Sequence, residues 1–227
     1  MHIHSLNFKT KFFQNLSSFI LPRSKNTDEC TFTRDGTFNT HNSHQWADVN
    51  PHASSTHAYQ RRFSINVWAG IIGDHLLGPY LLPERVDGKK YLTFLQQVLP
   101  EMMTDVPPRI RRVMWFQQDG APAHYAPEVR NYLNATFPNQ WIGRGGPVPW
   151  PARSLDLSCL DFFLWGHLKS LMYESPIESA EVLVARLSAA AGEVRDTPGV
   201  FQRVRESLLR RCTACIASNG ECFEQLL

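Results

Sequence analysis

Three aspartates stand in sequence contexts that suit metal chemistry. Asp28 lies in TDECTF, Asp119 follows an apolar run that ends in WFQQ, and Asp161 lies in DLSCLDFFLWGHLK. Hard divalent cations prefer carboxylate oxygens, and two such ions can clamp the attacking and leaving oxygens of a phosphodiester displacement. Three aspartates brought together from separate elements would therefore suit metal-dependent phosphodiester chemistry.

Each aspartate also has an ordinary structural explanation. Asp161 comes three residues after Ser158, where it could support the start of a helix through capping and charge. Asp119 is followed by Gly120 and then a proline, which is typical of a turn. Asp28 could be a surface acid. Spacing alone leaves both explanations open for all three residues.

The elements that must position these residues are predicted from apolar periodicity and turn residues. A hairpin is predicted over 62–83 with its turn at Gly73-Asp74, and a strand over 112–118 that ends at Asp119. Residues 31–51 indicate short strands and loops, and 141–154 a loop rich in Gly and Pro. Helical spacing predicts helices over 89–103, 127–134, from about Ser158, 177–193 and 199–217. This order predicts an α/β layered domain with a mixed sheet.

Composition describes a globular chain with little overall charge bias. A hydrophobic content of 43% in 227 residues is enough for one sizeable domain with a real core. The formal charge of only +2 argues against a protein that coats DNA, yet it allows an enzyme that binds DNA along one face. No apolar run has the length of a membrane helix, so no membrane partner is expected.

Two groups of potential zinc ligands have better structural explanations. Cys212 and Cys215 fall on one apolar helical face, and with Cys222 they lack a fourth ligand, which favours buried core thiols. An odd total of five cysteines fits a reduced intracellular chain. A histidine cluster stands among Asn and Ser without a cysteine, which does not favour zinc. Its members are His41, His44 and His52.

Long motifs extend well beyond the three aspartates. The strings FQQDGAPAH and WIGRGGPVPWPARSLDLSCLDFFLWGHLK resemble the catalytic core of mariner-like DDE/D transposases. TDECTFTRDGTFNTHNSHQWADVNPH and RFSINVWAGIIGDHLLGPY resemble the earlier part of the same domain, so that the resemblance runs from about Thr27 to the C-terminus. The fold implied is a ribonuclease-H-like α/β domain with a mixed central sheet flanked by helices.

The resemblance also implies a site and a reaction. The residues that match the metal ligands of the family are Asp28, Asp119 and Asp161, a DDD triad with 41 residues between the last two. The implied cofactor is Mg²⁺ or Mn²⁺, with two ions expected. The implied chemistry is hydrolysis of a DNA phosphodiester followed by strand transfer, with Gly120 letting the backbone turn away beside the metal.

Four further residues are candidates for supporting roles. Asp156 is the rival for third ligand, although in the family it belongs to the turn just before the catalytic acid. His124 could orient Asp119 or touch a phosphate, and it could equally be a packing histidine. Arg144 and Arg153 flank the loop near the proposed site and are candidates for phosphate contacts.

The sequence departs from the family pattern in ways that bear on activity. Only 26 residues precede Thr27, so we expect an irregular segment over 1–26 that is no DNA-binding domain, and a catalytic domain over 27–227. A polar stretch, Arg23 to Asn26, replaces the apolar run expected before the first aspartate, and Leu155 and Cys159 replace two prolines. These features predict a truncated and inactive copy as one outcome, with a non-catalytic nucleic-acid-binding or protein-interaction remnant as the alternative function.

Expected partners follow from the same comparison. Without a recognition helix, the chain is expected to bind DNA weakly and without sequence preference. The segment 199–216 is predicted to be a packed helix whose outer face carries Arg203, Arg205, Arg210 and Arg211. The resemblance allows a homodimer and predicts a nuclear location, or a cytoplasmic one if no targeting signal survives. The motif WPARSLDLSCLDFFLW disfavours a nuclease that cleaves RNA–DNA hybrids.

Overall fold

A single mixed sheet forms the centre of the chain. The computed structural model describes residues 24–34, 63–151, 154–221, 223, 225 and 227. Its five strands lie in the order β3-β2-β1-β4-β5. Their bounds are β1 Ser24–Thr33, β2 Ser64–Ile72, β3 His75–Leu82, β4 Trp115–Gln117 and β5 Trp141–Ile142. β1, β2 and β3 pair antiparallel, whereas β4 is parallel to both β1 and β5.

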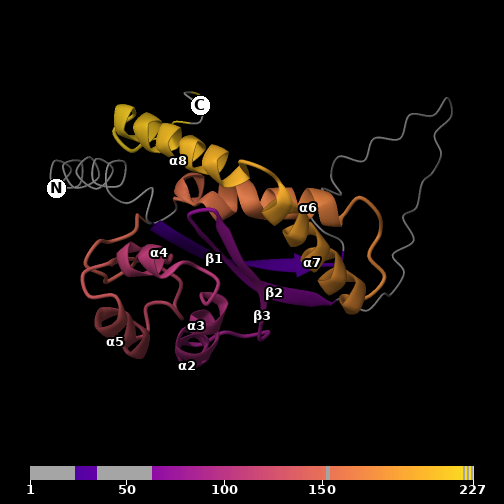
Figure 1. Cartoon of the computed structure of the whole chain (residues 1–227), viewed down its shortest axis with the longest axis horizontal. Helices are drawn as coiled ribbons and strands as arrows, with labels where there is room; N and C mark the ends of the chain where they lie inside the picture. The colour runs from indigo at the N-terminus through magenta and orange to yellow at the C-terminus, as the bar shows by residue number, and fades with distance from the viewer. Residues whose placement is uncertain (1–23, 35–62, 152–153, 222, 224, 226) are drawn as a thin grey trace, which may run out of the picture.

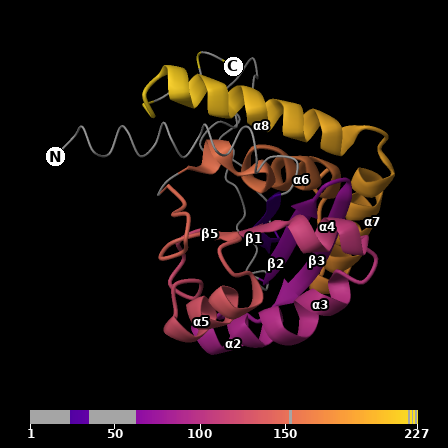
Figure 2. The same ribbon diagram turned by 60° about the vertical axis from the view of Figure 1, so that its left-hand side comes forward.

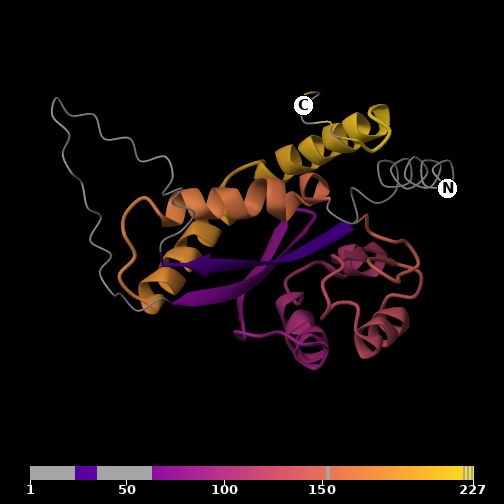
Figure 3. The same ribbon diagram turned by 180° about the vertical axis from the view of Figure 1, so that it is seen from behind.

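Helices cover both faces of this sheet (Figures 1 and 2). One layer contains α2 Gly88–Thr93, the π-helix η3 Phe94–Val98, α3 Leu99–Met102, α4 Pro108–Val113 and α5 Pro127–Thr136. The opposite side carries the π-helix η5 Leu160–Trp165, α6 Gly166–Met172, α7 Ala180–Asp196 and α8 Val200–Ala217. Seen from behind, β1 runs between the two layers (Figure 3).

Alternation along β2 explains the two layers. Val67, Ala69 and Ile71 belong to the core cluster formed with η5, α6 and α7. Trp68 and Ile72 belong to the cluster formed with α2, η3 and α5. Successive side chains of a strand point to opposite faces, so a nearly continuous apolar strand indicates a sheet that is covered on both sides. The predicted α/β layered architecture is confirmed.

Most predicted elements form, with corrections at short or polar segments. The hairpin turns at Gly73, which has a positive φ of 57°. Residues 112 and 113 end α4 instead of starting a strand, and the loop predicted over 141–154 contains the two-residue strand β5. Leu155–Leu157 forms a 3-10 turn without the family's prolines, closed by a hydrogen bond from the N–H of Ser158 to the carbonyl of Leu155.

The expectation of a damaged first strand is wrong. β1 begins at Ser24, so that residues 24–26, expected to be irregular, belong to the sheet. Lys25 is fully buried, with its Nζ 5.4 Å from the Trp68 ring centroid and 5.3 Å from that of Phe116. Its Nζ donates to the sulfur of Met103 at 3.5 Å, and burial lowers the Lys25 pKa well below its ordinary value. Lys25 therefore fills an apolar position with its stem, and burial there disfavours the charged form of its amine.

The C-terminal helix packs as predicted, but its arginines divide into two kinds. Cys212 and Cys215 are buried core thiols in α8, as expected. Arg205 pairs with Asp74 at 2.8 Å, and Arg211 donates to the Asp156 carbonyl, so these two are committed to contacts within the fold. Arg203 and Arg210 are exposed, although Arg203 also donates to the Pro198 carbonyl at 3.1 Å.

Some sequence-based expectations fall outside the described residues. They concern most of segments 1–26 and 31–51, the histidines His41, His44 and His52, and also Arg153 and Cys222. In the part of the chain that the structure describes, no helix is long and apolar enough to span a membrane.

Lys25→Met is expected to stabilise the fold at pH 7 by on the order of 1–3 kcal/mol, because it removes a buried polar group without a strong partner. Since burial lowers the Lys25 pKa, folding disfavours the charged amine, and this cost to stability appears below the unfolded-state pKa of 10.5. The gain should therefore shrink as pH rises toward that value. Urea unfolding from neutral to alkaline pH measures it, with exposed Lys89→Met as the control. Destabilisation of Lys25→Met at pH 7 would contradict the interpretation.

Candidate active site

The three aspartates singled out from the sequence line one cleft. Asp28 lies within β1, Asp119 follows β4, and Asp161 lies in the first turn of η5. The cleft has a volume of about 540 Å³. Its lining consists of Thr27, Asp28, Gln117, Asp119, Gly120, Ala121, Arg144, Trp150, Pro151, Ser154, Leu155, Ser158 and Asp161.

Parallel pairing of β1 with β4 places Asp28 beside Asp119. Asn26 is the register partner of Gln117, and each aspartate lies two residues further along its own chain. The hydroxyl of Thr27 donates to the Gln117 carbonyl at 2.6 Å, which ties the two segments together one step before the aspartates. The two carboxylates therefore project from adjacent segments at one edge of the pairing.

The π-helix η5 supplies both the third carboxylate and a partner for the first. The indole Nε1 of Trp165 donates to Oδ2 of Asp28 at 2.8 Å. Ser158 Oγ accepts a long hydrogen bond of 3.4 Å from the backbone N–H of Asp161. The capping explanation therefore applies to the Asp161 backbone, while its side chain lines the cleft. Single π-turns are frequent at functional sites.

The cleft holds more negative charge than its surroundings compensate. Burial raises the pKa of Asp28 to about 7, and the neighbouring charge of Asp161 adds to the rise, against the hydrogen bond from Trp165. Burial also raises the pKa of Asp161, which is close enough to Asp28 for the two carboxyls to share a hydrogen bond. Two desolvated acids in contact favour either a proton or a cation between them.

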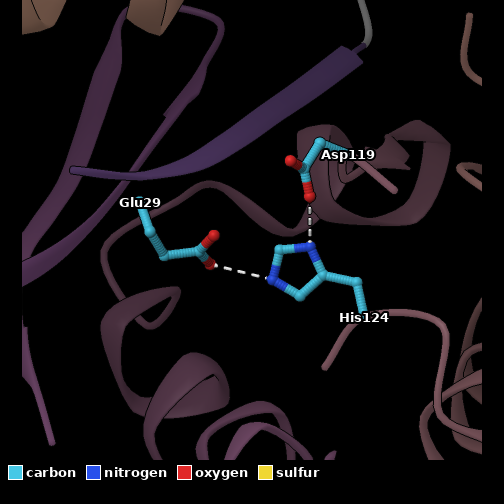
Figure 4. A group of neighbouring side chains, drawn as sticks. All are labelled: Glu29, Asp119 and His124. Atoms are coloured by element: carbon cyan, nitrogen blue, oxygen red, sulfur yellow. Dashed lines mark hydrogen bonds and ion pairs between the residues drawn. The ribbon is translucent and has the colours of Figure 1, made fainter. Parts of the chain in front are cut away.

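His124 lies between two carboxylates (Figure 4). Its Nδ1 is 2.6 Å from Oδ1 of Asp119, and its Nε2 forms an ion pair of 3.2 Å with Oε1 of Glu29. The side chain is 4% exposed and packs against the Tyr91 ring, with 4.2 Å between centroids and the ring planes tilted by 37°. Burial opposes its charge, but Glu29 and Asp119 outweigh burial and raise the His124 pKa to about 10. The ring is therefore an imidazolium at neutral pH.

This arrangement fixes one oxygen of Asp119. Oδ1 accepts from both His124 Nδ1 and the backbone N–H of Ala121, the latter at 3.0 Å. Burial alone would raise the pKa of Asp119, but the hydrogen bond and positive charge of His124 lower it below its ordinary value. Asp119 therefore stays ionised. Its side chain is about half exposed, so its second oxygen, Oδ2, remains available to a ligand in the cleft.

Glu29, Asp119 and His124 bring three potential metal-ligand atoms within 4.8 Å of one another. Both ring nitrogens already face carboxylates, however, and an imidazolium has no lone pair to offer a metal. We therefore assign this group as an ion-pair network that orients Asp119. Glu29 was not singled out from the sequence. The sequence feature that could have identified Glu29 is its position directly after Asp28 in a strand, because successive side chains of a strand point to opposite faces.

The other residues singled out from the sequence differ in whether they line the cleft. Asp156 is absent from the cleft lining, whereas Asp161 is part of it, so the geometry favours Asp161 as the third acid. Arg144 lines the cleft as expected. Gly120 does not have a positive φ, and an added Cβ would make only ordinary contacts with Arg144, so the expected need for glycine at this turn is wrong.

Comparison with known proteins gives matches at the level of structure. No protein-family model matches the sequence, and no curated protein matches it significantly. The "Mos1 transposase paired-end complex with left transposon end" matches with a TM-score of 0.72 and 22% identity over 99% of this chain. The Mos1 transposase catalytic domain with raltegravir and Mn matches with a TM-score of 0.70 and 19% identity, covering 99% of this chain and 98% of that one.

These matches establish the fold class predicted from the resemblance. The mixed five-stranded sheet flanked by helices is a ribonuclease-H-like fold. In particular, it is the fold of the catalytic domain of Mos1, a mariner transposase. The chain spans 65% of the length of the Mos1 chain in the paired-end complex.

Asp28→Asn is expected to stabilise the metal-free chain at pH 8 by on the order of 2 kcal/mol, because it removes a carboxylate that burial and Asp161 disfavour. The folded-state pKa of Asp28 is raised from 3.8 to about 7. The contribution of protonated Asp28 to the free energy of unfolding is therefore fully present below pH 3.8 and is lost as pH rises through about 7. Unfolding measured across this range should show a loss that is smaller in the variant. Asp156→Asn, outside the cleft lining, is the control, and equal pH profiles for Asp28→Asn and wild type would count against the assignment.

His124→Gln is expected to destabilise the fold by about 3–5 kcal/mol, because it leaves the charge of Glu29 without its partner. The His124 pKa is raised from 6.5 to about 10, so its contribution is complete below pH 6.5 and disappears as pH rises through about 10. A double-mutant cycle with Glu29→Gln, measured by urea unfolding, isolates the ion pair. Additive losses in that cycle would show that the pair is not coupled.

Proposed function

We propose that this chain is the catalytic domain of a mariner-like transposase that cleaves DNA phosphodiesters. The single observation that carries the proposal is the convergence of Asp28, Asp119 and Asp161, from β1, the end of β4 and η5, in one open cleft. The fold supports it, and similar structures include the "Mos1 Strand Transfer Complex" and a Mos1 paired-end complex with Mn.

The acidic residues fit divalent cations. Asp28, Asp119 and Asp161 would hold Mg²⁺ or Mn²⁺, with two ions proposed, because burial and mutual repulsion leave Asp28 and Asp161 short of positive charge. Bound there, two such ions would supply electrostatic stabilisation to the attacking and leaving oxygens of the displacement. Oxygen ligands of this kind are those that both cations prefer.

The chain's own residues would orient these ligands. His124 and the Ala121 N–H hold Oδ1 of Asp119, and Trp165 holds Oδ2 of Asp28, so that each acid keeps one defined oxygen for binding. The proposed reaction is attack of water on the phosphorus of DNA with departure of the 3′-oxygen. The freed 3′-hydroxyl then attacks a phosphorus of a target strand, the target's own 3′-oxygen departs, and the 3′-hydroxyl proton passes to solvent. No covalent bond to the protein is needed.

We also propose that DNA binding is weak and without sequence preference. Arg144 lines the cleft and can contact a phosphate, and a contact of this kind carries no base information. The site of action would be nuclear DNA. A non-catalytic DNA-binding role is the alternative function.

The test is nicking of supercoiled DNA by the purified chain with Mn²⁺ or Mg²⁺. Asp119→Asn and Asp161→Asn are expected to lower the rate by on the order of a hundredfold or more, because each removes a ligand of the catalytic ions. Asp156→Asn is the matched control for the third acid and should keep activity. Mn²⁺ should raise the melting temperature of the wild type, and its affinity should fall about tenfold per pH unit below about 7, since Asp28 must lose its proton.

Different outcomes separate the alternatives. Binding of DNA with no nicking in either metal would favour the non-catalytic role. Cleavage confined to RNA–DNA hybrids would indicate a different ribonuclease-H-like nuclease. Nicking that persists unchanged in Asp119→Asn would contradict the proposed site.

A further inference from the structure

Two arginines share one aromatic ring beside the cleft. The guanidinium carbon of Arg130, on α5, lies 4.5 Å from the ring centroid of Tyr125, and that of Arg144 lies 4.3 Å from it. The two charges are therefore within about 9 Å of each other, about one Debye length at physiological salt, so their repulsion is only partly screened. We call this group of three residues, Arg130, Tyr125 and Arg144, the arginine–tyrosine stack.

Neither arginine of the stack forms an ion pair with a carboxylate of the described residues. The ion pairs seen among the described residues involve His124 and Arg205, and neither Arg130 nor Arg144 has a carboxylate partner there. Nε of Arg130 is buried without a hydrogen bond. Two guanidinium groups held close together without a direct ion-pair partner are well arranged to receive an anion from outside.

The loop after β5 is built to make this contact. Gly145 has a φ of 76°, and a Cβ there would lie 3.0 Å from Tyr125 Cε2 and 3.1 Å from Arg130 Cδ. Only glycine therefore lets the backbone pass so close to the stack while holding this conformation. Hydrogen bonds from Gly143 N to Val148 O and from Gly146 N to Gly143 O close the loop on itself. Arg144 is thus presented from an ordered backbone.

The arginine–tyrosine stack begins in the cleft that holds the proposed metal site and extends beyond its lining. Arg144 lines the same cleft as the three aspartates, and its side chain lies beside Gly120, the residue after Asp119. Tyr125 and Arg130 lie beyond that lining. Both Tyr125 and Arg144 are exposed. A strand whose phosphate occupied the cleft would therefore pass the stack with a neighbouring phosphate.

The chemistry of stacked guanidinium groups fits a phosphodiester. A guanidinium that packs on an aromatic ring uses its flat face, and its N–H edge remains free to donate two parallel hydrogen bonds to phosphate oxygens. The ring restricts the rotamers of both arginines before binding, which lowers the entropy that a ligand must remove.

We propose that Arg130 and Arg144, aligned by Tyr125, bind the phosphodiester backbone of the DNA strand that enters the cleft. The identity of the ligand rests on the proposed DNA-cleaving function. The arrangement adds a strand-positioning site next to the acids, formed by the loop after Asp119, by α5 and by the loop after β5. Such contacts set the register of a strand and do not read its sequence.

Anisotropy of a short labelled DNA duplex, titrated at several salt concentrations without divalent metal, tests the proposal. Arg130→Ala and Arg144→Ala should each weaken binding several-fold and lower the slope of log affinity against log salt by about 0.9, the value for one lost phosphate contact. Tyr125→Ala should also weaken binding although it removes no charge, whereas Tyr125→Phe should retain it. Arg203→Ala, an exposed arginine of α8, is the charge-matched control and should have a smaller effect.

The outcomes separate this inference from the proposed function. Equal losses in Arg203→Ala and Arg144→Ala, or wild-type binding in Tyr125→Ala, would overturn the stack as a binding site. Thermal melting confirms that each variant is folded, and the conservative Tyr125→Phe rescue keeps the test valid if Tyr125→Ala is unfolded. If the wild type binds through the stack but never nicks DNA, the catalytic proposal fails and the inference stands. If the wild type nicks DNA while the stack variants bind DNA normally, the catalytic proposal stands and the inference about the stack fails.

Discussion

The parallel pairing of β1 with β4 is the constraint on which the site depends. It puts Asp28 and Asp119 at matching positions of neighbouring segments, and the Thr27 hydroxyl fastens the junction. The pairing forms even though β1 starts with polar residues. Lys25 occupies a fully buried position there, between the rings of Trp68 and Phe116. The sheet therefore tolerates the cost of a buried amine to keep its central strands in register.

Strand alternation then assigns different work to two adjacent acids. Asp28 and Glu29 point to opposite faces of β1, so one meets Trp165 and Asp161 while the other meets His124. On the first face like charges accumulate and favour a cation. On the second face a buried imidazolium satisfies two carboxylates and keeps Asp119 ionised.

Long patterned segments could be predicted from the sequence, whereas short or tertiary features could not. The hairpin at Gly73 and the helix α8 form as the apolar periodicity indicates. β5 has two residues, too few to carry a pattern, and β1 begins in a polar stretch that is held by tertiary contacts, with Lys25 over the Trp68 and Phe116 rings of the neighbouring strands. The meeting of the three aspartates was expected from the family resemblance, since spacing alone allowed capping and turn roles. The ion pair of Glu29 with His124 joins residues far apart in sequence: strand alternation places Glu29 on the face opposite Asp28, but nothing local identifies His124 as its partner.

Stability and site chemistry oppose each other in this fold. The contacts around His124 and Trp165 hold the acids in place, yet the same burial makes the cleft unfavourable without a counter-charge. A chain under selection for stability alone would lose Asp28 or Asp161 first, because neutral side chains there would relieve the repulsion. Bound ligands would explain why the chain keeps both acids. They would also explain the arginine–tyrosine stack, whose two positive charges have no ion-pair partner among the described residues. Cations would neutralise the acids, and a phosphodiester would neutralise the arginines, so that each ligand would favour binding of the other.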